Sequence, residues 1–438
     1  MESIIVRGGK KLSGEIKIQG SKNLFQKIIA ACVRWPGEYE LTNVPDILDA
    51  KWLMEQFVLV GGRLTKHAGV ITLDSRHISP ATISPKMTQR SRASFLFAGA
   101  FLGRFGEATL GLPGGDDIGD RPIDYHIEVF EALGIRATSL DKIIQLSLVN
   151  PATQQYRLPK PSIGATANAL LAARSEFTLK NCAYDSDILA FLEFLRMLGS
   201  DIYFSRKDQS ITISPAQSKN SISFDLHGDA HATATYALAA VLAGDQIKLT
   251  GINTSDTVPL WNYLERIGAD FDLNAVEKNV IIRQSALKND PVTVAGLTPP
   301  DFSTDWGPSV QLVMSQLPGG GTFHEEVFPN RFAHVPEFTK MGVRAQLKEV
   351  GSDKWIPARE WSARSIYDYC SIDGPASLHG ASVRANDMRA GAALVTAGLI
   401  AQGETRITEA VHVSRGYEDM VAILSSLGAD IRWEDARQ

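Results

Sequence analysis

The sequence is short of the features that mark several classes of protein. It holds three cysteines in 438 residues, Cys32, Cys182 and Cys370, far apart and without a Cys-x-x-Cys pair. This usage argues against a disulfide framework or a zinc site and suits a reducing compartment. No apolar run reaches the ~18 residues of a membrane-spanning helix, and the first residues lack the apolar core of a secretory signal. These absences predict a cytoplasmic protein.

An excess of positive charge is also absent. Lysine and arginine total 44 against 49 aspartate and glutamate residues, a formal net charge of −5. This balance gives no reason to expect nucleic acid or an anionic membrane as a partner, and nothing indicates an obligate protein partner. Apolar residues at 44% and charged residues at 21% describe an ordinary globular protein. Its length predicts two domains of about 200 residues each.

What the chain does contain is an internal repeat. At six places a predicted helix ends with an apolar residue followed by a glycine, and a predicted strand comes next. The six closures are Val60-Gly61, Leu133-Gly134, Leu198-Gly199, Ile267-Gly268, Met341-Gly342 and Leu427-Gly428. Glycine just past a helix end is the expected C-cap. The intervals between these glycines are 73, 65, 69, 74 and 86 residues, so the chain is built from six similar units.

Each unit has the same internal order, which predicts an α/β fold. A helix rich in small residues comes first, as at 165–173 and 390–401, then a short β-prone run and a second helix. Six β-α-β-α units divide naturally into two domains of three.

We therefore predict a first domain at 21–229 and a discontinuous second domain made of 1–20 plus 230–438. The N-terminal strands Ile4–Val6 and Glu15–Gln19 would complete the second domain. The last interval is the longest because about 350–380 carries additional, aromatic-rich sequence. Those aromatic residues either cover a cleft or, as we expect, pack within a surface insertion.

Cations stand at recurring junctions of these units. Lys22 and Asn23 follow Gly20-Ser21 at the start of the first helix, where free N–H groups and the helix dipole favour an anion. Five arginines also stand at such junctions. Arg92 and Arg389 are at the starts of two small-residue helices, and Arg121, Arg331 and Arg415 lie in loops. A single surface arginine means little, but six cations at junctions of a net-acidic chain predict a site for a multiply charged anion.

Acidic residues supply the candidate proton-transfer groups. Gly111–Ile127 contains four glycines, two prolines and four aspartates, so no regular element runs through it. It is either a solvated acidic turn or a catalytic loop, and Asp116 and Asp117 are its candidate acids, with Arg121 beside them. Asp305 is either the N-cap of the fifth unit's helix or a base near the arginines.

These residues fall into motifs that resemble the enolpyruvyl transferases, and in particular the branch that acts on a nucleotide sugar. The motifs are Gly20-Ser-Lys-Asn23, Leu112-Pro-Gly-Gly115, Ile118–Asp124, Ser162–Thr166, Thr304-Asp305, Val327–Pro336 and Ser414-Arg-Gly-Tyr417. The resemblance covers nearly the whole chain. It implies two inside-out α/β barrel domains, each with a pseudo-threefold axis, and a mobile loop at 111–121.

The resemblance also implies a reaction without a metal or other cofactor. The enolpyruvyl group of phosphoenolpyruvate passes to the 3-hydroxyl of UDP-N-acetylglucosamine through a tetrahedral ketal, and phosphate is released. This would be the first committed step of peptidoglycan precursor synthesis. Its implied phosphoenolpyruvate ligands are Lys22, Arg92, Arg121, Arg331, Arg389 and Arg415. Its implied UDP-sugar ligands are Asn23, Arg121, Pro122, Ile123, Asp124, Tyr125, Lys160, Ser162, Ile163, Gly164, Asp305 and Val327. Its implied catalytic residues are Asp116, Asp305, Lys22 and Arg415.

Four departures from the family pattern leave the acceptor less certain than the donor. Asp116 stands where most members have cysteine, Trp306-Gly307-Pro308 follows Asp305, and Asp229–Thr233 lacks the usual arginine and glutamate. The aromatic insertion is the fourth. Two alternatives therefore stay open: a related enzyme that uses another uridine nucleotide, and a catalytically silent protein that binds a nucleotide sugar.

The aspartate at position 116 predicts insensitivity to fosfomycin, which alkylates the family's loop cysteine. A carboxylate is a far weaker nucleophile than a thiolate, so incubation should leave both activity and protein mass unchanged. Intact-mass spectrometry and timed activity assays would check this, with a relative that has the loop cysteine as the positive control. Time-dependent inactivation with a covalent mass increase would refute the prediction.

Overall fold

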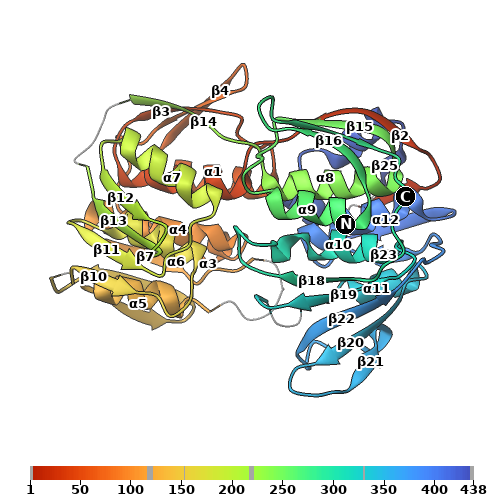
Figure 1. The fold of residues 1–438 in the computed structure, drawn as a ribbon. Helices are drawn as coiled ribbons and strands as arrows, with labels where there is room; N and C mark the ends of the chain where they lie inside the picture. Colours follow the sequence, from red (N-terminus) through yellow and green to blue (C-terminus); the bar gives the residue numbers. More distant parts are fainter. Residues whose placement is uncertain (1–2, 116–121, 152, 217–220, 329–330, 435–438) are drawn as a thin grey trace. The chain divides into compact units, whose positions relative to one another are not determined.

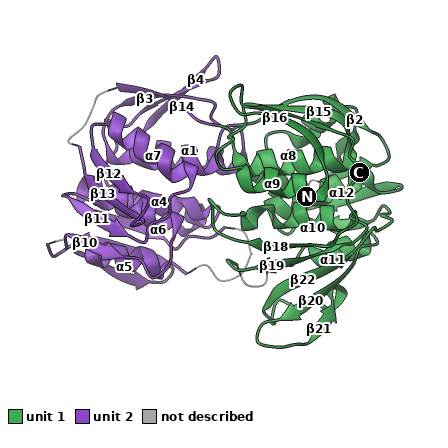
Figure 2. Cartoon of the chain, in the orientation of Figure 1, with its two compact units in different colours: residues 1–19, 116–120, 228–438 green, residues 20–115, 121–227 purple. Residues whose placement is uncertain are grey.

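The computed structural model describes residues 3–115, 122–151, 153–216, 221–328 and 331–434. These residues form two compact α/β units (Figures 1 and 2). Unit 1 contains residues 3–19 together with the described residues from 228 onward. Unit 2 contains residues 20–115 and the described residues of 122–227. In the part of the chain that is described, no helix has the length and apolar character to cross a membrane.

The described strands form six sheets, and their order repeats. In each sheet a leading strand runs parallel to a second strand. The second strand pairs antiparallel with a third, which is itself antiparallel to a fourth. The sheets of unit 2 are β14-β3-β5-β4 (Ser221–Asp225, Glu38–Thr42, Val70–Asp74, Arg63–His67), β6-β7-β9-β8 (Thr82–Ile83, Glu107–Gly111, Ile143–Leu148, Ile135–Leu140) and β10-β11-β13-β12 (Gln155–Arg157, Phe177–Lys180, Ser210–Ser214, Asp201–Ser205).

Unit 1 repeats this order with strands from both ends of the chain. Its sheets are β2-β15-β17-β16 (Leu12–Lys17, Gly244–Thr250, Asn279–Arg283, Asp270–Asn274), β18-β19-β22-β20-β21 (Val292–Gly296, Gly321–Glu325, Tyr367–Asp373, Arg344–Glu349, Trp355–Pro357) and β23-β24-β1-β25 (Ser382–Arg384, Glu404–Thr408, Ser3–Arg7, Asp430–Glu434). The N-terminal strand β1 lies between β24 and β25 and is antiparallel to both. The first strands of the chain therefore complete the unit formed by its second half.

One helix of each repeat is buried on nearly all sides, and we call these six the inner helices. They are α1 (Lys22–Arg34), α4 (Leu96–Phe105), α6 (Ile163–Ala172), α8 (Ala230–Ala243), α10 (Gly307–Met314) and α12 (Met388–Ile400). Their small residues let the helix backbones approach closely. A Cβ on Gly103 of α4, for example, would lie 2.1 Å from the carbonyl oxygen of Leu171 in α6. A helix that is apolar all round belongs in a core, so the inner helices form the centre of each unit.

The second helix of each repeat ends at the glycine that the sequence predicts. These helices are α2 (Leu48–Leu59), α5 (Asp124–Ala132), α7 (Ser186–Met197), α9 (Val258–Ile267), α11 (Val335–Lys340) and α14 (Met420–Ser426). All six closing glycines have positive φ, between 78° and 105°, a conformation that costs other residues energy. The repeat and its C-caps are confirmed. A β-hairpin rather than a single strand follows five of these helices, whereas after α14 the strand β25 pairs with the N-terminal strand β1.

The added segment is shorter in the structure than the aromatic insertion that the sequence predicts at about 350–380. Strand β22, at Tyr367–Asp373, pairs with β19 and β20 and is the regular strand of its repeat, so the additional sequence is not the whole of 350–380. What is added is the short strand β21 and the 3-10 helix η3 (Ala358–Glu360). Trp361 packs against the core of unit 1, and Tyr367 is buried.

Three arginines join the C-terminal ends of the inner helices of unit 2, and we call them the arginine ring. Arg34, at the end of α1, donates to the carbonyls of Leu171 and Ala173 at the end of α6. Arg174 donates to Leu102 and Gly103 at the end of α4, and Arg104 donates to Val33 at the end of α1. The three contacts form a cycle, so the three helices are parallel with their C-terminal ends together. Positive charge at these ends offsets the aligned helix dipoles.

The arginine ring predicts a stability effect. Burial, and then the positive charges of Arg174 and Arg104, lower the pKa of Arg34 to about 10, so Arg34 stays charged at neutral pH. Arg34→Met removes its hydrogen bonds to α6 and should lower the free energy of unfolding by about 1–3 kcal/mol. Chemical denaturation at pH 7 measures this. Arg136→Met, at an exposed position of β8, is the matched control and should change stability by less than about 0.5 kcal/mol; equal effects would contradict the role of the ring.

Candidate active site

Asp305 is the centre of a polar cluster in unit 1. It lies in the 3-10 helix η2 (Thr304–Trp306), which leads directly into α10. The N-cap of η2 is Ser303, whose Oγ accepts a hydrogen bond from the Asp305 N–H at 3.3 Å. The carboxylate of Asp305 caps neither helix. The interpretation of Asp305 as an N-cap is therefore wrong, and its side chain is available to the cluster.

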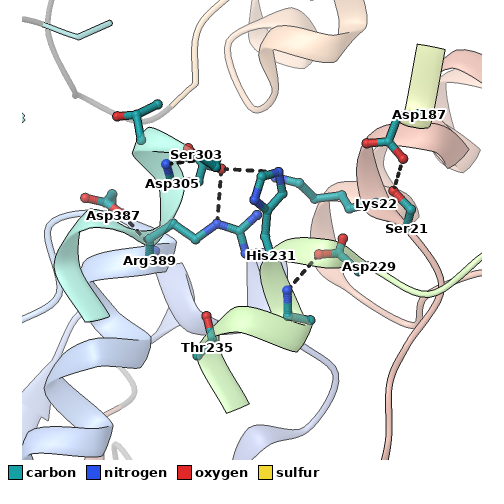
Figure 3. A network of polar contacts seen from close by, with 12 residues as sticks. Ser21, Lys22, Asp187, Asp229, His231, Thr235, Ser303, Asp305, Asp387 and Arg389 are labelled. Carbon is teal, nitrogen blue, oxygen red and sulfur yellow. Dashed lines mark hydrogen bonds and ion pairs between the residues drawn. The ribbon is translucent and has the colours of Figure 1, made fainter. Parts of the chain in front are cut away.

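Three basic side chains from other elements face the Asp305 carboxylate, and Figure 3 shows two of them, His231 and Arg389. Arg331 Nη1 lies 2.7 Å from Oδ1, and Arg389 Nε lies 3.3 Å from Oδ2. His231 Nε2 lies 3.9 Å from Oδ2. The two arginine side chains are 5% and 4% exposed, whereas that of Asp305 is 26% exposed. The carboxylate thus lies between buried guanidinium groups and solvent.

These positive charges decide the protonation state of Asp305. Burial by itself raises the pKa of its carboxyl, but the charges of Arg331, His231 and Arg389 outweigh burial and hold the pKa well below its usual range. Asp305 is therefore an ionised carboxylate at neutral pH and, with both arginines bound to it, a weak base.

Arg389 is positioned by the start of α12 and by the end of the next short helix. Asp387 is the N-cap of α12 and accepts hydrogen bonds from the N–H groups of Arg389 and Ala390 at 2.8 and 3.0 Å. The guanidinium Nη1 donates to Tyr417 Oη at 3.0 Å, and that hydroxyl is 2.8 Å from Thr235 Oγ1 on α8. Residues from two inner helices thus fix this cation.

Arg331 is positioned by a second chain of hydrogen bonds. Its Nη1 donates to Thr304 Oγ1 at 3.2 Å, and the Thr304 hydroxyl donates to Glu325. Glu325 Oε1 accepts from the N–H groups of Val327 and Phe328 at 2.9 and 3.0 Å. Burial raises the pKa of Glu325, although the Arg331 charge opposes it. Glu325 therefore ties the predicted sugar contact, Val327, to the arginine.

Arg415 is buried in unit 1, but the prediction that it lies in a loop is wrong. It belongs to the short helix α13 (Val411–Gly416). Two residues on, Tyr417 contacts Arg389. The side chain of Gln19 holds the end of α13, because its Nε2 donates to Gly416 O at 3.0 Å and its Oε1 accepts from Glu418 N at 2.9 Å.

In unit 2 the predicted ligands Lys22 and Asn23 begin α1. Ser21 is the N-cap, and its Oγ accepts from Leu24 N at 3.2 Å and donates to Asp187 Oδ1 at 2.6 Å. Lys22 Nζ lies 3.4 Å from Asp49 Oδ2, and both side chains are buried. The prediction that Lys22 opens the first helix is confirmed, and a buried carboxylate accompanies it.

The other predicted ligands of unit 2 lie at the starts of two helices. Arg92 Nη2 donates to the carbonyl of Pro122 at 2.7 Å, which links it to the segment Ile123–Tyr125 at the beginning of α5. Ser162 caps α6, which starts with Ile163 and Gly164, and Lys160 precedes this cap and is exposed.

His126 connects these two helix starts. Its Nδ1 is 2.8 Å from Asn168 Nδ2, so Nδ1 is the acceptor and the proton is on Nε2. A Cβ on Gly164 would lie 3.0 Å from that Nε2, so the imidazole lies against the first turn of α6. Burial, and then the charge of Arg92, lower the pKa of His126 to about 3, which keeps the imidazole neutral.

Three sequence candidates lie outside the described residues: Asp116, Asp117 and Arg121. The described segment that leads to them is held by two hydrogen bonds. Leu112 N donates to Lys142 O at 2.8 Å, and Gly114 N donates to Thr88 O at 3.1 Å.

The sequence did not single out His231, Glu325 or Tyr417. His231 lies in the segment that departs from the family pattern, and Tyr417 ends the Ser-Arg-Gly-Tyr motif, so each had a weak signal. Glu325 had none, because a glutamate at a strand end is usually solvated. Together the cluster can hold a carboxylate between two guanidinium forks and offer Asp305 as a proton acceptor.

Comparison with known proteins finds relatives that match almost the whole chain. Residues 6–424 match the EPSP synthase (3-phosphoshikimate 1-carboxyvinyltransferase) family. A UDP-N-acetylglucosamine 1-carboxyvinyltransferase of Wolbachia pipientis subsp. Culex pipiens is 33% identical over 98% of this chain and 99% of its own length. A UDP-N-acetylglucosamine 1-carboxyvinyltransferase 2 of Streptococcus pyogenes serotype M1 is also 33% identical, over 99% of both chains.

Solved structures share the fold. The enolpyruvyl transferase NikO from Streptomyces tendae matches with a TM-score of 0.85 and 24% identity, over 99% of this chain and 98% of its own. An EPSP synthase from Acinetobacter baumannii matches with a TM-score of 0.73 and 16% identity, over 99% and 100%. The two-domain inside-out α/β fold is confirmed.

The ion pairs of Asp305 predict a pH-dependent contribution to stability. Asp305→Asn leaves Arg331 and Arg389 without their carboxylate and should lower the free energy of unfolding by about 2–4 kcal/mol at neutral pH. Because the folded-state pKa is depressed, this contribution is complete above the unfolded pKa of about 3.9 and is lost as the pH falls through the folded value.

Denaturation of the wild type and Asp305→Asn at several pH values measures the effect. The difference should stay constant from pH 8 to about pH 5 and shrink below about pH 4. A difference that grows as the pH falls would contradict the assignment.

Proposed function

The chain belongs to the EPSP synthase family of enolpyruvyl transferases, and we propose that it transfers the enolpyruvyl group of phosphoenolpyruvate to the 3-hydroxyl of UDP-N-acetylglucosamine. Phosphate is the second product. The full-length relatives that carry this activity in their names support the choice of acceptor. The proposal includes the cytoplasmic location predicted from the cysteine usage.

The observation that carries the proposal is the pair of buried guanidinium groups on Asp305. Arg331 and Arg389 are held by Thr304 and Tyr417, and both are aimed at one carboxylate. Phosphoenolpyruvate has a carboxylate of the same shape and charge. In our proposal that carboxylate takes over the two cations when the substrate binds. Asp305 then loses the charges that depress its pKa and becomes a better base.

The proposed chemistry proceeds by addition and elimination. Asp305 accepts the proton of the acceptor hydroxyl, whose oxygen bonds to C2 of phosphoenolpyruvate while C3 gains a proton. The resulting ketal is tetrahedral and still carries the phosphate. Loss of a C3 proton and cleavage of the C2–O bond to phosphate then give the enolpyruvyl ether. The proton that C3 gains in the addition is lost again in the elimination, and the proton that Asp305 takes from the acceptor hydroxyl leaves with the released phosphate.

The remaining roles rest on the family resemblance. Lys22, Arg92, Arg121 and Arg415 would bind the phosphate of phosphoenolpyruvate and stabilise its charge as the C–O bond breaks. Asp116 would act as the acid. The substrate-binding set at Asn23, 122–125, Lys160, 162–164 and Val327 would hold the UDP-sugar, and these helix starts suit phosphate groups.

The test is phosphate release from phosphoenolpyruvate with UDP-N-acetylglucosamine as the acceptor. Asp305→Asn should lower kcat at least about 100-fold, because general-base catalysis contributes 10²–10⁴-fold. Asp301→Asn, an exposed aspartate four residues earlier, is the matched control and should keep wild-type kcat.

Other outcomes favour the alternatives. Release with a different uridine nucleotide, and none with UDP-N-acetylglucosamine, would replace the proposed acceptor and favour the related enzyme of secondary metabolism. Nucleotide-sugar binding without turnover for every acceptor tried would favour a silent binding protein.

A further inference from the structure

Lys27 is a buried lysine on the inner helix α1 of unit 2. Only 3% of the residue is exposed. Its Nζ donates to the carbonyl of Asn23, 3.0 Å away in the first turn of the same helix. The long side chain thus runs back along α1 and leaves its ammonium group at the N-terminal end.

Among the residues that the structure describes, no carboxylate lies within 4.0 Å of Lys27 Nζ. The single hydrogen bond to Asn23 uses one of its three N–H donors. The other buried lysine of this helix is different, because Lys22 has Asp49 at 3.4 Å. Buried charges are normally paired, since leaving water without a partner costs several kcal/mol.

The position on the helix adds to this cost. An α-helix carries partial positive charge at its N-terminus, where a second positive charge is unfavourable. Burial and the helix dipole both oppose an ammonium group here, and the contact that the described residues offer it is the Asn23 carbonyl, which carries no full charge. Such a group is expected where a ligand supplies the missing negative charge.

The third repeat provides an internal comparison. Asn168 on α6 stands six residues after the cap Ser162, as Lys27 stands six residues after the cap Ser21. Asn168 is fully buried and satisfied, since it accepts from Gly99 N and donates to Phe95 O. At the equivalent place in the first repeat stands Lys27, for which the described part of the chain supplies no counter-ion within 4.0 Å. Packing at this position therefore does not require a charge.

We propose that Lys27 is a specificity-determining residue that binds an anionic group of the acceptor substrate. It lies one turn from Asn23 on the same face of α1, and Asn23 is the residue that the proposed function assigns to the acceptor. The inference rests on that function for the acceptor's identity but not for the anion site. A phosphate group of the nucleotide is the anion that the proposed acceptor offers.

Lys27→Met, Lys27→Arg and the control Lys51→Met test the proposal. Lys51 is a half-exposed lysine of α2 that pairs with Asp46. Without ligand, Lys27→Met should raise Tm by about 2 °C or more, because it removes an uncompensated buried charge. It should also raise KM for UDP-N-acetylglucosamine about tenfold or more and leave KM for phosphoenolpyruvate within about threefold. Lys27→Arg should keep most of the affinity, and Lys51→Met should change neither quantity.

A lower Tm with unchanged KM would make Lys27 a structural residue and overturn the proposal. A change confined to KM for phosphoenolpyruvate would also overturn it, because the anion would then belong to the donor. Calorimetric titration with UDP-N-acetylglucosamine keeps the test independent of turnover. If the wild type binds this probe but releases no phosphate, the proposed function fails, while weaker binding by Lys27→Met still supports the anion site.

Discussion

Parallel helices that are buried side by side bring like ends of their dipoles together. The partial charges that gather at these ends have to be offset by other groups of the unit. In unit 2 the arginine ring meets the C-terminal ends, and each guanidinium donates to the carbonyls of a neighbouring helix. The N-terminal ends receive side-chain caps from Ser21 and Ser162. Caps satisfy N–H groups but leave the positive potential of the aligned dipoles in place. The fold itself therefore creates regions that attract anions.

In unit 1, charged side chains lie at the N-terminal ends of the inner helices α8, α10 and α12. His231 and Arg389 lie in the first turns of α8 and α12, and each contacts the carboxylate of Asp305, which lies just before α10. One carboxylate lies among three basic groups, so the cluster is complete without a substrate and still positive overall. In the proposed function, the carboxylate of the substrate replaces that of Asp305 on Arg331 and Arg389. Stability and substrate binding would then depend on the same two guanidinium groups.

The repeat, the fold class and the family could be predicted from the sequence because they rest on local signals. Closing glycines need positive φ, small-residue helices belong in a core, and ordered motifs identify a family. Contacts between distant segments could not be predicted in this way. The ion pair of Asp305 with Arg331 depends on how η2 meets the turn after β19, and the burial of Lys27 depends on helix packing. The sequence predicts a loop at Arg415, but the structure has it in the short helix α13.

The pairing of β1 between β24 and β25 has a consequence for synthesis of the protein. Ser3–Arg7 leaves the ribosome long before its partners at 404–408 and 430–434. Unit 2 can be completed when residue 227 has emerged, whereas β1 in unit 1 stays unpaired until residues 404–434 have emerged. Such long sequence separation slows folding and leaves a strand edge exposed.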